Sequence, residues 1–366
     1  MKPLFALGFR PLYLLAGLYA ALSVPTWAAQ YAGWLPAANP LWHAHEMLFG
    51  YAFAVIAGFL LTAVRNWTGM PTPSGAALAA IAALWVAARV LAFYSLGLSV
   101  FVDAAFAIVL AWGIGRPIVA SCNRNWYFIL LVLALGAASV LFQAAPRLAL
   151  QAGLDLVLLV IAIMAGRVVP AFTNSAVPRA GARRVQWLEH GALGSVILLL
   201  LFDLSDFATA AGIVALAGAA LHAARVALWA PLATRGRPIL WILHLSSAWI
   251  VVHLLLRGLA AFDIVPAPLA THALTVGVIG GLTLGMMTRT SRGHVGLALE
   301  TGRAELAAYL LVHAAAVVRV LVPLFAPSFY AASIALSAAL WSVAFALFVI
   351  RYYPILSRPR IDGKPG

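Results

Sequence analysis

Cysteine and charged residues are both scarce in this chain of 366 residues. With one cysteine, Cys122, it can form no intrachain disulfide, no Cys-x-x-Cys redox pair and no cysteine-ligated iron–sulfur cluster. Charged residues make up 9% of the chain, whereas soluble domains contain about a quarter. Hydrophobic residues make up 64%, and the mean hydropathy is +1.01. This composition excludes a soluble globular protein.

Long apolar runs indicate how the chain folds. Each is about 20 residues long, which is the length an α-helix needs to cross a bilayer, and the runs do not alternate as the strands of a membrane barrel do. We therefore expect an all-α polytopic membrane protein that forms a single transmembrane helical domain over residues 1–366, and we see no internal repeat. The twelve predicted transmembrane stretches lie near 11–32, 41–64, 75–94, 98–115, 126–145, 148–170, 187–205, 208–228, 238–258, 267–288, 304–324 and 328–350.

The distribution of positive charge predicts the orientation. The net charge is +13, and of the 23 lysines and arginines all but Arg89, Arg147, Arg257 and Arg319 fall on the side that holds both termini. Cytoplasmic connections are enriched in lysine and arginine, so we expect both termini in the cytoplasm. The cations lie at helix ends, which indicates contact with a lipid bilayer and no nucleic-acid partner.

Nine histidines are the residues most informative about chemistry, because a buried imidazole in a membrane needs a partner. The densest group is WHAHEMLFGY at 42–51. Asn39 can cap this helix. In an α-helix, His43 and Glu46 are three residues apart and share one face, while His45 lies on another. Glu46 is then a candidate metal ligand, orienting group or catalytic proton carrier. The alternative is that these histidines only form hydrogen bonds near the membrane surface.

Several histidines at similar depth fit metals that accept neutral imidazole, chiefly haem iron and copper, while zinc is not excluded by ligand type. The sequence has no Cys-x-x-Cys-His motif, so a haem would be a non-covalent b-type group. His222 and His244 are expected at a similar depth on adjacent spans, and His43, His45 and His272 are expected to converge near the outward face.

Charged residues inside the spans have two interpretations. Arg89, Asp103, Asp155 and Arg167 can pair with one another. Alternatively, Arg10 or Arg89 holds a haem propionate, and a buried aspartate carries protons.

Several motifs along the chain resemble those of the NnrS family of bacterial membrane proteins. They are GFRP (8–11), WHAHEMLFGYAFAVIAGFLLTAV (42–64), NWTG (66–69), GRVVPAFT (166–173), ILHLSSAWI (242–250), THALTVGVIGG (271–281) and MTRTSRGH (287–294). The resemblance implies a multi-pass protein of the bacterial inner membrane that contains b-type haem and copper and acts in nitric oxide metabolism. It also implies metal-associated roles for His43, His45, Glu46, His244 and His272. Because His244 lies in the matched motif ILHLSSAWI, it is our candidate axial haem ligand, with His222 as the opposite ligand or as a hydrogen-bonding partner.

Three functions are compatible with these features. The first is reduction of nitric oxide to nitrous oxide at a histidine-ligated metal, with Glu46 passing protons. The second is a transporter or a metal- or haem-handling protein. The third is a stress-protective protein that binds nitric oxide without turnover. Reduction also requires an electron donor, and no motif identifies that donor or an oligomeric state.

Overall fold

The computed structural model describes residues 3–36 and 40–363, and within them every regular element is helical. Asn39, the expected helix cap, lies outside these residues. The elements are η1 (Pro3–Phe5), α1 (Phe9–Tyr31), α2 (Pro40–His45), η2 (Glu46–Ala52), α3 (Phe53–Thr68), α4 (Ala76–Tyr94), α5 (Leu96–Ala120), α6 (Tyr127–Leu141), α7 (Pro146–Ala176), α8 (Gln186–Leu204), α9 (Ala208–Leu228), η3 (Pro231–Thr234), α10 (Pro238–Ala260), α11 (Ala267–His272), η4 (Ala273–Gly280), α12 (Gly281–Val295), α13 (Arg303–Phe325), η5 (Pro327–Phe329) and α14 (Tyr330–Leu356).

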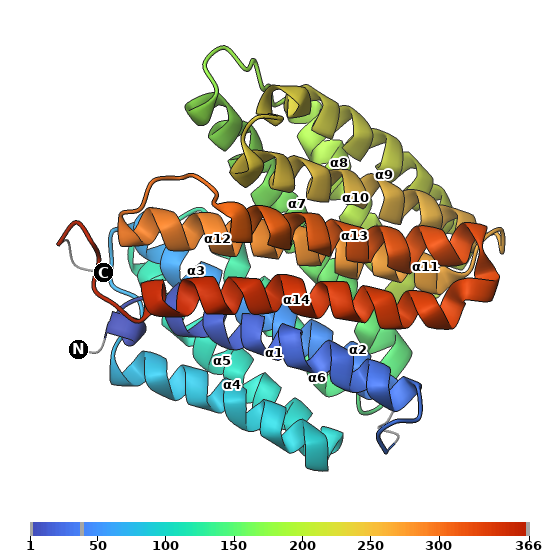
Figure 1. The fold of residues 1–366 in the computed structure, drawn as a ribbon, viewed down its shortest axis with the longest axis horizontal. Helices are drawn as coiled ribbons and strands as arrows, with labels where there is room; N and C mark the ends of the chain where they lie inside the picture. The colour runs from blue at the N-terminus through green and yellow to red at the C-terminus, as the bar shows by residue number, and fades with distance from the viewer. Residues whose placement is uncertain (1–2, 37–39, 364–366) are drawn as a thin grey trace. The chain divides into compact units, whose positions relative to one another are not determined.

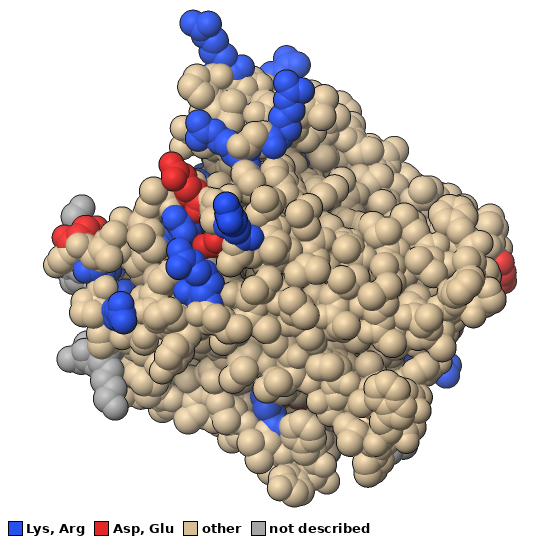
Figure 2. All heavy atoms as spheres, in the orientation of Figure 1, with Lys and Arg blue, Asp and Glu red and all other residues tan. Residues whose placement is uncertain are grey.

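The helices confirm the predicted all-α membrane fold. Within residues 3–36 and 40–363, eleven helical segments are long and apolar enough to cross a membrane, and the shorter apolar helix α6 coincides with the fifth predicted stretch. Large apolar side chains such as Leu22, Phe101 and Ile350 are exposed on these helices, as expected for surfaces that face lipid. Most of the face drawn in Figure 2 carries no charge, and basic side chains gather at its top, over the α7–α8 connection. The exposed arginines of that connection are Arg179, Arg183 and Arg184.

The helix ends follow from local sequence. The Ser95 side chain accepts a hydrogen bond from the Leu98 amide and caps α5. Gly69 ends α3 with a φ of 69°, a left-handed conformation that glycine adopts without steric cost. Helix α7 was predicted to end near Pro170 but continues to Ala176. A proline inside a helix removes one backbone donor, and here the residues on both sides of it stay helical.

The chain divides into two compact units. Unit 1 comprises residues 1–156, 289–298 and 348–366, and unit 2 comprises 157–288 and 299–347. Within unit 1, α4 and α5 lie side by side (Figure 1), and η2 contacts both α1 and α4. Within unit 2, α9 packs against α8 and α10 (Figure 1), and η4 contacts both α10 and α13.

Helices α9 and α10 of unit 2 approach each other closely through small residues. A methyl group built on Gly212 would clash with Ala261, and one built on Gly258 would clash with Leu216. A side chain at Gly218 would press on Leu254 and Ser195. Small residues of this kind allow the backbones of membrane helices to come together, so the α9–α10 interface is filled by the helices themselves.

Two spans contain a π-helix, in which hydrogen bonds run from residue i to i+5. In unit 1, α2 ends at His45 and the π-helix η2 begins at Glu46. In unit 2, α11 ends at His272 and the π-helix η4 begins at Ala273. Isolated π-helical turns are rare and occur frequently at functional sites, so these two junctions direct attention to the side chains around them.

Candidate functional site

The junction between α2 and η2 carries a buried acid and a buried imidazole. His45 and Glu46 both have side chains with 0% exposure. The Nδ1 atom of His45 lies 2.8 Å from Oε1 of Glu46. The His45 ring therefore contacts the carboxylate of the residue that follows it, a contact that the helical spacing of His43 and Glu46 did not predict.

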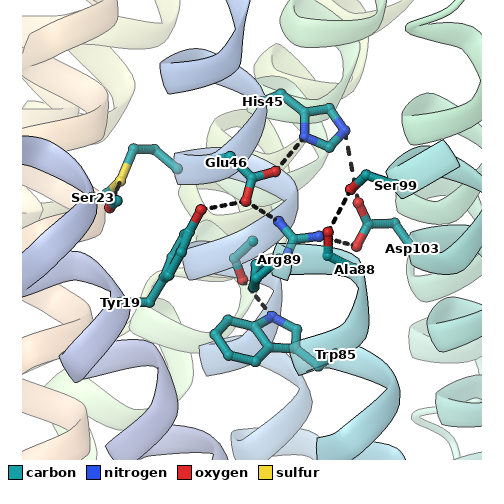
Figure 3. A network of polar contacts seen from close by, with 11 residues as sticks. Tyr19, Ser23, His45, Glu46, Trp85, Ala88, Arg89, Ser99 and Asp103 are labelled. Atoms are coloured by element: carbon teal, nitrogen blue, oxygen red, sulfur yellow. Dashed lines mark hydrogen bonds and ion pairs between the residues drawn. The ribbon is translucent and has the colours of Figure 1, made fainter. Parts of the chain in front are cut away.

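Arg89 of α4 joins two carboxylates from different helices (Figure 3). Its guanidinium lies 2.9 Å from Oε2 of Glu46 and also pairs with Oδ1 of Asp103 on α5. This is one of the pairings that were possible among Arg89, Asp103, Asp155 and Arg167. The neighbouring Trp85 donates its indole N–H to the carbonyl of Gly50, 3.0 Å away, and so ties η2 to α4. A side chain at Gly50 would clash with Arg89, so this close approach requires glycine.

Two further contacts complete this acid–imidazole network, which we define as Tyr19, His45, Glu46, Arg89 and Asp103. The hydroxyl of Tyr19 on α1 donates a hydrogen bond to Oε2 of Glu46. The Nε2 atom of His45 lies 3.7 Å from Oδ2 of Asp103. The His45 ring therefore stands between two carboxylates, one facing each ring nitrogen (Figure 3).

The charges of the network favour one additional proton. With a neutral His45, the single positive charge of Arg89 faces the two negative charges of Glu46 and Asp103. One proton on His45 or on either carboxylate makes the network neutral. Burial strongly disfavours net charge in a medium of low dielectric constant, so the network is suited to hold one exchangeable proton.

Two other predicted site residues of unit 1 have different surroundings. The His43 ring stacks on Trp27, with 4.3 Å between ring centroids. Arg10 is 1% exposed, and its Nη1 donates to the carbonyls of Leu356 and Arg358 at 2.9 and 2.7 Å. Arg10 thus satisfies backbone groups at the end of α14, and its role toward a haem propionate stays a prediction.

Unit 2 contains imidazoles that hydrogen-bond to backbone carbonyls. Nε2 of His222 on α9 lies 3.2 Å from the carbonyl of Ala192, and Nδ1 of His253 on α10 lies 2.8 Å from the carbonyl of Ala270. A carbonyl only accepts, so each of these nitrogens carries the ring proton. His272 has the same kind of bond, from Nδ1 to the Pro268 carbonyl at 2.7 Å.

His244 and His313 hydrogen-bond to hydroxyl groups. Nε2 of His244 on α10 lies 2.8 Å from the hydroxyl of Thr173, which donates its own proton to Val169. Nε2 of His313 on α13 lies 3.4 Å from the hydroxyl of Ser246, which donates to Ile242. Each hydroxyl proton is already used, so each imidazole donates from Nε2 and keeps a lone pair on Nδ1.

Four imidazoles of unit 2 thus share one property: one nitrogen donates to oxygen, and the other is buried without a hydrogen-bond partner. The unpartnered atoms are Nδ1 of His222, Nδ1 of His244, Nε2 of His253 and Nδ1 of His313. Histidines that bind metals typically donate their second nitrogen to a carbonyl or carboxylate in this way. The four residues therefore fit ligands of a metal that accepts neutral imidazole.

The sequence pattern did not identify every residue of these groups. Tyr19 lies in a continuous apolar run, and His253 and His313 have no neighbouring motif, so only their tertiary partners distinguish them. The buried pair formed by Arg225 and Glu189, 2.7 Å apart, was also not expected. Arg225 additionally donates to the carbonyl of Ala162, and this set of contacts joins α7, α8 and α9.

The number of available ligands limits which metals fit. Among residues 3–36 and 40–363, no three His, Cys, Asp or Glu side chains form a group that could hold a metal ion. Structural zinc sites need four protein ligands, and catalytic zinc sites need three. Haem iron and monovalent copper need only one or two imidazoles, so the histidines of unit 2 fit these metals best.

These observations define a polytopic helical membrane protein with a buried acid–imidazole network in one unit and buried, oriented imidazoles in the other. The chain belongs to the NnrS family: the family model described as NnrS protein matches residues 3–360, which is nearly the whole chain. No curated protein matches the sequence.

Proposed function

We propose that this protein binds b-type haem and copper in the bacterial inner membrane and reduces nitric oxide there. Two NO, two electrons and two protons give one N₂O and one water. The observation that supports this most directly is the set of four buried imidazoles of unit 2, each oriented by one hydrogen bond and each keeping an unpartnered nitrogen. Membership of the NnrS family is consistent with a role related to nitric oxide.

His244 would hold the haem iron through Nδ1, the ring nitrogen that is buried without a hydrogen-bond partner. The Thr173 hydroxyl fixes the ring from the opposite nitrogen, and the side chain is 3% exposed. When bound, haem iron and copper supply coordination of nitric oxide and the electron transfer. The protein's part is to hold the imidazole in one tautomer and to keep water away from it.

The acid–imidazole network supplies the proton chemistry in this proposal. His45 can accept a proton at one ring nitrogen and release it at the other, between Oε1 of Glu46 and Oδ2 of Asp103. Tyr19 and Arg89 stabilise the charged form of Glu46 through a hydrogen bond and an ion pair. Nitric oxide is small, neutral and soluble in lipid, so it can reach the bundle from the bilayer.

Nitrous oxide formation tests the proposed activity. The detergent-purified protein, loaded with haem and copper and kept reduced by dithionite under argon, should convert added nitric oxide to nitrous oxide at a rate proportional to protein. Binding of nitric oxide without nitrous oxide would support the protective role instead. A protein that takes up neither haem nor copper would contradict the proposal.

His244→Gln should remove or alter the haem spectrum. The glutamine amide can replace Nε2–H in the bond to Thr173 but has no equivalent of Nδ1. We expect loss of the Soret band or its conversion from a low-spin to a high-spin form, measured on purified protein. His190→Gln, at an exposed position of α8, is the matched control. An unchanged spectrum and haem content in His244→Gln would remove His244 as a ligand.

A transporter is the second candidate function, and the two interrupted spans favour it. Transporters bind substrates where membrane helices lose regular α-helical geometry, and η2 and η4 are such sites. Metal-independent, proton-dependent uptake of a solute by liposomes containing the protein, without nitrous oxide formation, would select this function.

The membrane orientation gives a separate prediction. If both termini lie in the cytoplasm, alkaline phosphatase fused after Gly366 should be inactive, because the enzyme becomes active only after export. A fusion within the α8–α9 connection, between Leu204 and Ala208, should be active. The opposite pattern would reverse the orientation inferred from the distribution of arginine and lysine.

A further inference from the structure

Exposed arginines gather on the two connections of unit 2 that join α7 to α8 and α9 to α10. They are Arg179, Arg183 and Arg184 in the first connection, and Arg235 and Arg237 in the second. Residues 177–185 and 229–237 contain no aspartate or glutamate. Basic side chains are visible over the α7–α8 connection at the top of Figure 2. The two connections therefore present positive charge without a balancing acid of their own.

The two connections lie against each other. The backbone amide of Arg183 donates to the carbonyl of Leu228, the last residue of α9, at 2.8 Å. The short helix η3 follows, and the amide of Arg237 donates to the carbonyl of Thr234 at 2.8 Å, which keeps the second connection compact. The arginines of both connections thus share one area of surface, and we call these five residues the basic patch.

The α7–α8 connection is held in one conformation by its own hydrogen bonds. The side-chain amide of Asn174 donates to the carbonyl of Ala182 at 2.8 Å, and its oxygen accepts from the Ala182 amide at 3.0 Å. Nη2 of Arg184 lies 3.6 Å from Oε2 of Glu189, an oxygen that also pairs with Arg225. Glu189 thus has two cationic neighbours and leaves the patch positive. A surface that is already ordered loses little conformational entropy when it binds an anion.

The patch lies at the ends of helices that are long and apolar enough to cross a membrane. Its arginines are one to three residues from these ends, since α7 ends at Ala176, α8 begins at Gln186 and α10 begins at Pro238. Trp187, in the first turn of α8, is 69% exposed, and tryptophans at such positions lie at the level of the lipid head groups. The guanidinium groups are therefore at the depth of the lipid phosphates, which favours lipid over a soluble partner.

We propose that the basic patch binds the head groups of anionic phospholipids, with its guanidinium groups donating hydrogen bonds to phosphate oxygens. A guanidinium group is planar and presents paired N–H donors that match the geometry of a phosphate. Leu232, which is 82% exposed in η3, supplies an apolar contact beside the patch. Because both connections contribute arginines, bound lipid would join the ends of α7, α8, α9 and α10.

Binding of phosphatidylglycerol to the full-length, detergent-purified protein tests this proposal. The test variant carries Arg179→Gln, Arg183→Gln and Arg235→Gln, which leaves the contact between Arg184 and Glu189 in place. Native mass spectrometry of delipidated protein measures the bound lipid, and the Tm measures its effect on stability. We expect phosphatidylglycerol to bind the test variant more than about tenfold more weakly than the unmodified protein and to raise its Tm less. Phosphatidylcholine, which has no net charge, should not distinguish the two proteins.

A control variant makes the same change in net charge away from the patch. It carries Arg116→Gln, Arg124→Gln and Arg358→Gln, which replace three exposed arginines of unit 1. The control variant should keep the affinity of the unmodified protein for phosphatidylglycerol. Equal weakening in the test and control variants would show a general effect of net charge and would overturn the site.

Photo-cross-linking locates the lipid without any substitution. A phosphatidylglycerol with a photoreactive head group, added to the unmodified protein, should attach to peptides that contain residues 177–187 or 229–237. Attachment only to other peptides would overturn the site. An equal rise in Tm with inorganic phosphate alone would show a site for a free anion. An acidic protein that is lost from the test variant, while phosphatidylglycerol binds both proteins equally, would assign the patch to a protein partner. Either result would overturn the assignment to lipid.

Discussion

Arg89→Met should destabilise the protein by about 3–5 kcal/mol, the usual cost of removing one partner from a buried ion pair. Methionine nearly preserves the volume of the side chain, which is 3% exposed and packs beside Gly50. The change leaves Glu46 and Asp103 as two buried carboxylates without their shared cation. The free energy of unfolding, measured by titrating detergent-solubilised protein with dodecyl sulfate, checks this value.

Arg116→Met is the matched control for this prediction. Arg116 is exposed on α5 and lies over the ring of Trp112, an arrangement worth about 0.5–1 kcal/mol. Adding Asp103→Asn to Arg89→Met removes one of the two unpaired charges, so it should recover part of the lost stability. Equal effects of the Arg89 and Arg116 substitutions would show that the network is not a buried ionic site.

Glu46→Gln should slow nitrous oxide formation by about 10²–10⁴-fold, the range expected for loss of a proton-transferring group. The glutamine side chain keeps the size of Glu46 and can accept the hydrogen bond from Tyr19, but it cannot carry the exchangeable proton. Haem and copper contents should be unchanged, because Glu46 belongs to the network and not to the imidazoles of unit 2. The rate is measured from nitrous oxide released by reduced protein.

Glu300→Gln is the control for Glu46→Gln, since Glu300 is exposed in the α12–α13 connection. It should keep the full rate. A Glu46→Gln protein that is folded, carries its metals and reduces nitric oxide at the original rate would remove Glu46 from the reaction and leave the network with a structural role.

The positions of the membrane helices could be predicted from the sequence because a run of apolar residues carries both the length and the location of a span. The helix ends were harder to place. Helix α12 was expected to end near 288, but it continues to Val295, since Thr288, Arg289 and Arg292 are buried within the protein. Polar residues at the end of an apolar run therefore did not mark the end of the helix.

The candidate site could be predicted only in part. Pairing among the charged residues inside the spans was one of two interpretations and followed from the cost of burying unpaired charge, but the sequence did not indicate that Arg89 pairs with Asp103. The His45–Glu46 contact could not be predicted, because helical periodicity describes which residues share a face and not how two adjacent side chains turn toward each other. The orientation of His244 depends on the hydroxyl group of Thr173 on α7, which is 71 residues away in sequence. The residues around His244 therefore could not predict this contact.

The segments around the two interrupted spans match each other over more than the π-helix. When residue numbers are shifted so that His45 aligns with His272, Gly50 aligns with Gly277 and Gly58 aligns with Gly285. The same shift places α1 over α10, α4 over α13 and α5 over the start of α14. The packing also agrees, since η2 contacts α1 and α4 while η4 contacts α10 and α13. The two four-span segments therefore share the order of their elements and the place of their π-helix.

The two segments carry different polar groups in the same order of elements. The shift that aligns His45 with His272 places Glu46 on Ala273 and Asp103 on Tyr330, so the later segment has neither acid. In the opposite direction, it places His244 on Gly17 and His253 on Thr26, so the earlier segment has neither imidazole. Carboxylates therefore surround one interrupted span and imidazoles accompany the other, and the two kinds of buried polar group can be altered separately by substitution.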